Sequence, residues 1–295
     1  MAFGAVAGLA VALLLLAPTS NRTAAAPELI PVRATLADES SPVAGGGYLA
    51  WSQAGAVYVQ RGRAAPCKIS APRTLGAPGG LFGPVLSYTE NSARGGRVLL
   101  MDLTTGRKAV VVPYRDSTVI YRAGVAGDTL LYGWRQRPSD GIVLRNVGDG
   151  SERTLAFASH RSVSDAASLD LGQLSGDFAV WTRCSRSCSV YRYDVRADVA
   201  VPLPTRTGTS QYASSVTRAG TAYVLESTAR TRPQLVRYGA DGRRTALLSL
   251  PRGTEVACTY AASEQGRTAV YLNLYRFSGR RTVQFDIYKV IDPAS

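Results

Sequence analysis

The sequence repeats one pattern of short strands six times. Each copy has an apolar strand with a large central side chain, a polar loop and an alternating strand, and four copies add a third short apolar strand. The central residues are Trp51, Tyr88, Tyr132, Trp181, Val224 and Tyr271, which are 37, 44, 49, 43 and 47 residues apart. A period of about 40–50 residues with several strands in each unit is typical of propeller blades.

The clearest copy spans residues 175–204, where residues 178–181, 190–193 and 199–201 form three short runs rich in Val and aromatic side chains. Such runs between turn residues predict strands, and no window keeps the spacing of an amphipathic helix. Before most copies stands another short segment that ends in a Gly turn, which we interpret as the innermost strand of a blade. These segments are residues 79–83, 120–124, 169–172, 215–220 and 256–260. The prediction is an all-β, six-bladed propeller of four-stranded antiparallel blades.

The sixth copy lacks its closing strand, whereas residues 29–34 alternate like a strand but precede the first copy. A propeller must join its first and last blades or leave an edge exposed. We therefore predict that this N-terminal strand completes the sixth blade, and that residues 27–295 form a single propeller domain.

An unbroken apolar run at residues 2–17 is followed by small residues at 24–26. The run is short for a membrane span and suits the core of a signal peptide. No Lys or Arg precedes it, and Pro27 would follow the cut. Residues 1–26 are predicted to be a cleavable signal peptide, with an uncleaved N-terminal anchor as the alternative, and only that anchor would attach the protein to a membrane.

Four cysteines are consistent with export to an oxidising compartment. Cys184 and Cys188 are close enough in sequence to bridge a hairpin, whereas a metal pair would need further Cys or His ligands nearby. We predict a disulfide. Cys67 and Cys258 fall in the first and last copies, and whether they pair is left open.

A formal charge of +13 favours anionic surroundings such as wall polymers, lipid headgroups or acidic proteins. The arginines are spread over every copy, as expected for solvated loop charges. No nucleic-acid motif, dinucleotide fingerprint, P-loop or cluster of metal-ligating residues is present, so we expect neither a nucleic-acid partner nor a cofactor.

Two stretches resemble a known family. Residues 86–90 with 98–106, and residues 176–183 with 190–194, look like the WD-like repeat of TolB-type β-propellers. The resemblance covers about residues 45–290, but the Ser-Pro-Asp-Gly turn that opens the family's repeats is missing. It implies an exported protein-interaction module. Some such propellers precede prolyl-oligopeptidase hydrolase domains, but no Gly-x-Ser-x-Gly elbow occurs here, and the single histidine, His160, is interpreted as a loop residue.

Equivalent loops of a propeller share a face, so the polar residues after each second strand should project from one rim. We call it the recognition rim. Its predicted binding residues are Gln53, Glu90, Asn91, Arg135, Arg183, Glu226 and Arg276. Polar residues at strand ends are common in any protein, so a purely structural role is the competing interpretation.

The predicted function is a non-catalytic, monomeric binding module, secreted or held at the bacterial cell envelope, with a protein or an envelope ligand, including an anionic one, as partner. The alternative is a propeller enzyme of glycosidase or lyase type acting on an anionic glycan or polymer. In that case Glu90 and Glu226, three blades apart, would be the acid and base. A third hypothesis is a binder of anionic polymers or membrane surfaces that acts through charge alone.

Overall fold

The computed structural model describes residues 27–33, 35, 37–159, 167–278 and 281–295. The predictions for the N-terminal segment and for His160 fall outside these residues. None of the described residues belongs to a helix that is long and apolar enough to cross a membrane.

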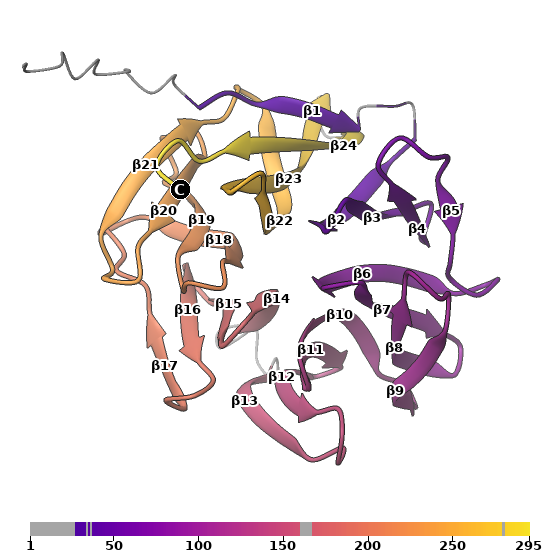
Figure 1. Cartoon of the computed structure of the whole chain (residues 1–295). Helices are drawn as coiled ribbons and strands as arrows, with labels where there is room; N and C mark the ends of the chain where they lie inside the picture. Colours follow the sequence, from indigo (N-terminus) through magenta and orange to yellow (C-terminus); the bar gives the residue numbers. More distant parts are fainter. Residues whose placement is uncertain (1–26, 34, 36, 160–166, 279–280) are drawn as a thin grey trace, which may run out of the picture.

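The described chain forms six four-stranded antiparallel sheets arranged around a central axis (Figure 1). Blade 1 contains β2 (Glu39–Gly45), β3 (Tyr48–Gln53), β4 (Ala56–Arg61) and β5 (Cys67–Lys68). Blade 2 contains β6 (Leu75–Phe82), β7 (Val85–Ser92), β8 (Gly95–Asp102) and β9 (Lys108–Arg115). Blade 3 contains β10 (Val119–Ala126), β11 (Thr129–Gln136), β12 (Ser139–Asn146) and β13 (Glu152–Ser159).

Blade 4 contains β14 (Ser168–Ser175), β15 (Phe178–Cys184), β16 (Cys188–Asp194) and β17 (Val199–Pro202). Blade 5 contains β18 (Ser210–Val216), β19 (Ala222–Ser227), β20 (Gln234–Tyr238) and β21 (Arg244–Ser249). Blade 6 contains β22 (Thr254–Glu264), β23 (Arg267–Ser278), β24 (Arg281–Ile291) and β1 (Ile30–Arg33). The predicted six-bladed propeller is confirmed.

The N-terminal strand closes the ring as predicted. β1 pairs antiparallel with β24, with Ile30 opposite Lys289 and Pro31 opposite Tyr288. Arg33 then reaches the neighbouring blade, where its guanidinium carbon lies 4.1 Å from the centre of the Trp51 ring. One strand therefore belongs to blade 6 and also contacts blade 1.

Three innermost strands extend beyond their predicted bounds, and two, β6 and β18, are displaced toward the N-terminus. Residues 215–220 were predicted as a strand, but β18 ends at Val216 and a turn follows, in which Gly220 has φ of 80°. β6 begins earlier than the predicted residues 79–83, and its glycines allow a close approach to blade 3. A Cβ atom at Gly79 would lie 2.1 Å from the Ala123 carbonyl oxygen, so no larger residue fits there.

All six innermost strands carry a bulge against their second strand. Ser41 and Ala213, at two of these bulges, adopt φ of 53° and 47°. A bulge bends a strand and redirects its side chains. The innermost strands are therefore bent at these positions.

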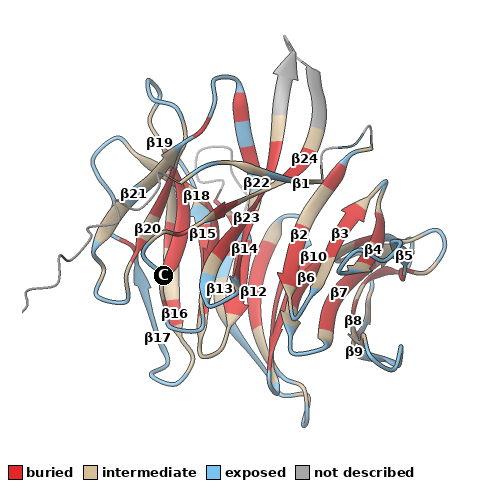
Figure 2. Ribbon diagram, turned by 45° about the horizontal axis from the view of Figure 1, so that its top comes forward, coloured by how far each residue is buried: buried red, intermediate tan, exposed pale blue. Residues whose placement is uncertain are grey.

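The hydrophobic core lies between neighbouring blades rather than in one centre. Trp51, Tyr88 and Tyr132 are fully buried, each in a cluster that joins two or more blades. Burial is concentrated in the inner strands, whereas the outer strand β17 is exposed along its length (Figure 2). Each blade is therefore stabilised mainly by its neighbours.

The predicted disulfide is confirmed, since Cys184 and Cys188 are bonded at the hairpin that joins β15 to β16. Cys67 and Cys258 are free cysteines. They lie on the outermost strand of blade 1 and the innermost strand of blade 6, respectively.

Candidate functional site

The second strands of all blades end at the same rim of the ring, so the seven predicted positions lie at strand ends that share a face. Arg276 lies on β23, opposite Thr254 and Gln284, but its side chain is outside the described part. Gln53 accepts a hydrogen bond from the Trp51 indole at 3.2 Å. Arg183 is exposed. The local contacts of the other four positions show what each can do.

Glu90 is almost completely buried and bound by several donors. Arg97, on the next strand of the same blade, donates two hydrogen bonds to Glu90 Oε2 at 3.0 and 2.6 Å. The backbone N–H of Ala71 donates to Glu90 Oε1 at 2.7 Å. Beside it, the Asn91 amide exchanges two 2.9 Å hydrogen bonds with the backbone of Ile120 and so joins blades 2 and 3.

Glu226 is held in the same manner. Arg244 donates to Glu226 Oε2 at 3.0 and 2.7 Å, Gln211 donates to Oε1 at 3.2 Å, and the Tyr238 hydroxyl also donates to Oε1. Burial alone would raise the pKa of this carboxyl, but these hydrogen bonds outweigh it, so the pKa is lowered. The pKa of Tyr238 is raised to about 12 by its burial and by its bond to Glu226.

Arg135 pairs with the buried Asp140 through two hydrogen bonds of 2.8 and 3.1 Å. Asp140 also accepts a 3.2 Å hydrogen bond from the backbone N–H of Leu169 in blade 4. The recognition rim is therefore a series of local contacts within blades and between neighbouring blades. Glu90 and Glu226 each have their own arginine, and no described contact joins the two carboxylates.

Sequence reasoning missed a group of side chains that reach across the ring. Arg122 on β10 is buried, and its guanidinium donates to the carbonyls of Leu171 in blade 4 at 3.5 Å and Thr259 in blade 6 at 3.2 Å. Gln173 is buried and bonded through its amide to the backbone of Ala261 at 2.9 and 2.8 Å. A charged residue inside a predicted innermost strand was the signal for Arg122.

Asp170 and Cys258 lie next to the carbonyls that Arg122 contacts. The pKa of Asp170 is raised because the surrounding blades partly desolvate its carboxylate on the ring axis, although the neighbouring Arg122 lowers it. Burial likewise raises the pKa of the Cys258 thiol. Asp170 reaches solvent on the axis, whereas Arg122 is buried and joins its own blade 3 to blades 4 and 6.

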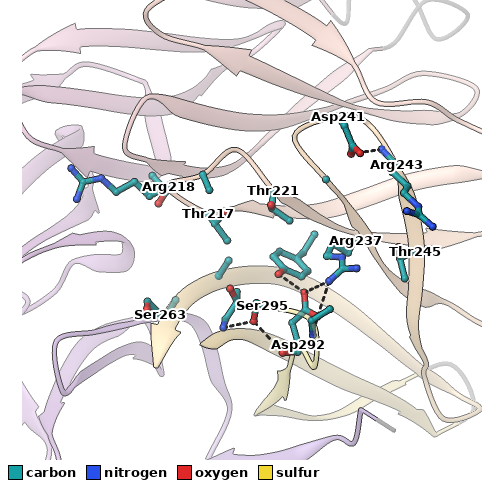
Figure 3. A pocket seen from close by; sticks show the side chains of 18 residues that line it. Thr217, Arg218, Thr221, Arg237, Asp241, Arg243, Thr245, Ser263, Asp292 and Ser295 are labelled. Atoms are coloured by element: carbon teal, nitrogen blue, oxygen red, sulfur yellow. Dashed lines mark hydrogen bonds and ion pairs between the residues drawn. The ribbon is translucent and has the colours of Figure 1, made fainter. Parts of the chain in front are cut away.

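A pocket of about 840 Å³ lies between blades 5 and 6, at the rim opposite the recognition rim. Figure 3 shows the side chains that line it. We call it the seam pocket. The turn between β18 and β19, the turn between β20 and β21, the end of β22 and the C-terminal residues line it. Its volume is within the range that accommodates small-molecule ligands.

One wall of the seam pocket is fixed by Asp292. This buried carboxylate accepts hydrogen bonds from Arg237 at 3.0 and 3.1 Å and from the Tyr223 hydroxyl at 2.7 Å. The pKa of Tyr223 is raised by burial and by this hydrogen bond. These hydrogen bonds connect the blade 5 wall of the pocket to the blade 6 wall and fix their relative position.

The remaining walls carry hydroxyl groups and arginines. Arg218 and Arg243 are exposed at opposite edges of the pocket, and their guanidinium groups extend outward from it (Figure 3). Hydroxyl groups come from Ser175, Thr217, Thr221, Thr245, Ser263, Thr268 and Ser295. Asp241 adds a carboxylate that already accepts the backbone N–H of Arg243 at 2.9 Å. This lining can bind a hydroxyl-rich ligand that carries negative charge.

Within the described residues, no group of three or more His, Cys, Asp and Glu side chains is placed to hold a metal ion. The chemistry available at the seam pocket is therefore that of hydrogen bonds, guanidinium groups and a fixed carboxylate.

The molecule is thus a closed propeller with polar pockets at its seams. No protein-family model matches the sequence, and comparison with curated proteins finds no match either. Solved structures share the fold. TolB from Acinetobacter baumannii is 12% identical with a TM-score of 0.53; the alignment covers 83% of this chain and 59% of TolB.

An oligogalacturonate lyase in complex with manganese is 10% identical with a TM-score of 0.55, over 83% of this chain and 86% of the lyase. An acylaminoacyl peptidase from Pyrococcus horikoshii is 12% identical with a TM-score of 0.52, over 85% of this chain and 46% of the peptidase. The predicted TolB-type propeller fold is confirmed. Because these proteins differ in activity, the likeness shows the fold alone.

Proposed function

We propose that this protein is an exported, non-catalytic propeller that binds a hydroxyl-rich, anionic ligand of the cell envelope, such as an acidic oligosaccharide. The seam pocket carries this proposal, because its lining combines many hydroxyl groups with the exposed guanidinium groups of Arg218 and Arg243. The Cys184–Cys188 disulfide and the apolar N-terminal run support the exported location.

The arrangement of the rim carboxylates favours binding over catalysis. A glycosidase needs one carboxylic acid that keeps its proton near neutral pH. Glu226 has a lowered pKa and is bonded to Arg244, and Glu90 is bonded to Arg97. Both contacts suit structural ion pairs, which counts against an acid and base role for these two carboxylates.

The proposal is tested by titrating the protein with tetragalacturonate, an oligosaccharide with hydroxyl groups and carboxylates, and with uncharged maltotetraose. We expect saturable binding of tetragalacturonate and binding of maltotetraose that is weaker by about tenfold or more, which corresponds to the loss of charge-assisted hydrogen bonds. Absorbance of an unsaturated sugar product should not increase during the titration, since that product would indicate lyase activity.

The matched variants remove two arginines each. Arg218→Ala with Arg243→Ala should weaken tetragalacturonate binding about tenfold. Arg63→Ala with Arg107→Ala removes the same charge at exposed positions in other blades and should leave the affinity for tetragalacturonate unchanged. Equal losses in both double variants would show that net charge alone drives binding, and no binding by the unmodified protein would refute the proposed ligand class.

A further inference from the structure

A second pocket, of about 620 Å³, lies at the other end of the seam between blades 5 and 6, on the recognition rim. Three arginines line it: Arg230 and Arg232 from the loop between β19 and β20, and Arg252 from the loop between β21 and β22. We call it the arginine pocket. It is separate from the seam pocket, with which it shares no lining residue.

These arginines differ from most others at the blade seams. Arg97, Arg135, Arg237 and Arg244 each pair with a buried carboxylate. In the described part of the chain, no carboxylate forms an ion pair with Arg230, Arg232 or Arg252. All three are exposed. Three like charges around one pocket repel one another, and an anion in the pocket would relieve that repulsion.

The two loops that present the arginines are tied together. The backbone N–H of Leu250, the first residue of the second loop, donates to the Pro233 carbonyl at the end of the first loop at 2.9 Å. Within the first loop, the backbone N–H groups of Arg230 and Thr231 donate to the Thr228 hydroxyl at 3.2 and 3.1 Å. Such contacts hold the backbone of the arginines in place before a ligand arrives, which lowers the entropic cost of binding.

The second loop is fixed in the same way, and one carboxylate is present. Thr254 Oγ1 donates to the Pro251 carbonyl at 2.7 Å. Glu255 also lines the pocket, but its carboxylate accepts the Tyr275 hydroxyl at 3.0 Å. With three arginines and one glutamate, the lining keeps a formal charge of +2.

We propose that the arginine pocket binds a small polyanion that carries at least two phosphate or carboxylate groups. Guanidinium groups bind both kinds of oxyanion through paired hydrogen bonds. A single oxyanion engages one or two guanidinium groups, so three of them on two fixed loops favour a ligand with several charged groups. The proposal goes beyond the function proposed above and does not depend on it.

The test is calorimetric titration of the full protein with inorganic tripolyphosphate, citrate and inorganic orthophosphate, at low and at high salt. We expect tripolyphosphate or citrate, or both, to bind at least about tenfold more tightly than orthophosphate, with binding that weakens as salt is added. The stronger of the two ligands identifies the preferred oxyanion.

Two matched triple variants separate a site from a general charge effect. Arg230→Ala, Arg232→Ala and Arg252→Ala together should weaken binding of the stronger polyanion at least about tenfold. Arg63→Ala, Arg107→Ala and Arg186→Ala together remove the same charge from exposed positions in blades 1, 2 and 4 and should change it less than about twofold.

The proposal is overturned if neither polyanion binds more tightly than orthophosphate, or if both triple variants lose affinity equally. Circular dichroism of each variant confirms that the fold is retained. The double variant Arg218→Ala with Arg243→Ala should bind the polyanion normally, which distinguishes failure of this site from failure of the seam pocket.

Discussion

Each of the two rim carboxylates considered as a catalytic group is neutralised by an arginine from a later strand of its own blade. Glu90 on β7 pairs with Arg97 on β8, and Glu226 on β19 pairs with Arg244 on β21. Removing one partner of a buried ion pair strongly destabilises a folded protein, because the remaining buried charge is left without compensation. These residues are therefore expected to contribute to stability.

Replacing Glu226 by Gln tests this role. The substitution keeps the shape but leaves Arg244 without its counter-charge, so the free energy of unfolding at pH 7 should fall by about 1–3 kcal/mol. Because the pKa of Glu226 is lower in the folded protein, its contribution is complete above about pH 4.3, the pKa of an unperturbed Glu.

That contribution is lost as the pH falls through the lower folded pKa, so the unmodified protein and the Gln variant should converge in stability in acid. Urea unfolding between pH 7 and pH 3 measures the difference. A variant as stable as the unmodified protein at pH 7 would contradict the structural role of this ion pair.

The sequence placed these carboxylates at the ends of their strands but could not pair them. Arg97 and Arg244 stand 7 and 18 residues after their partners, and neither spacing distinguishes an ion pair from a solvated loop charge. Arg122 was missed for a similar reason, since its partners are carbonyls of two other blades. Contacts across the ring depend on how the blades are placed in space, and the pattern of strands in the sequence does not give that placement.

At the scale of single elements, β1 has the largest consequences. It supplies the outermost strand of blade 6, and the Arg33 side chain at its end contacts blade 1. Arg33 Nε lies 3.6 Å from Glu39 Oε1, and Arg33 Nη1 donates a 3.3 Å hydrogen bond to Gln60 Oε1. Period-two alternation and a missing last strand were enough to predict this closure, because both are visible in the sequence. By contrast, β18 was placed too late, because its Gly turn resembles a strand end.

Deletion of residues 27–36 should therefore unfold the propeller, because it uncovers the edge of β24 and removes the link between blades 6 and 1. The cooperative melting transition of the ring should then be lost. Deletion of residues 1–26 alone is the matched control and should leave the melting temperature unchanged. Differential scanning calorimetry of both forms makes the comparison. Identical melting curves would show that the ring does not depend on this strand.

At the scale of the whole molecule, both pockets lie at opposite ends of the one seam between blades 5 and 6. The axis is instead crossed by Arg122 and Gln173, which bond to the backbone of other blades. Six repeats predict the ring, but the pockets depend on loop residues that differ from one blade to the next. That difference explains why the sequence did not predict the seam pocket.

Ligand binding is thus proposed to depend on the arginines of the seam pocket, whereas Glu90 and Glu226 stabilise their own blades. The sharpest measurement compares the dissociation constants for tetragalacturonate of Glu90→Gln and of the double variant Arg218→Ala with Arg243→Ala, at a temperature where both are folded. Both carry the Arg230→Ala, Arg232→Ala and Arg252→Ala changes, so that the arginine pocket does not contribute. We expect unchanged binding by Glu90→Gln and about tenfold weaker binding by the double variant. Lost binding in Glu90→Gln together with normal binding in the double variant would contradict this proposal.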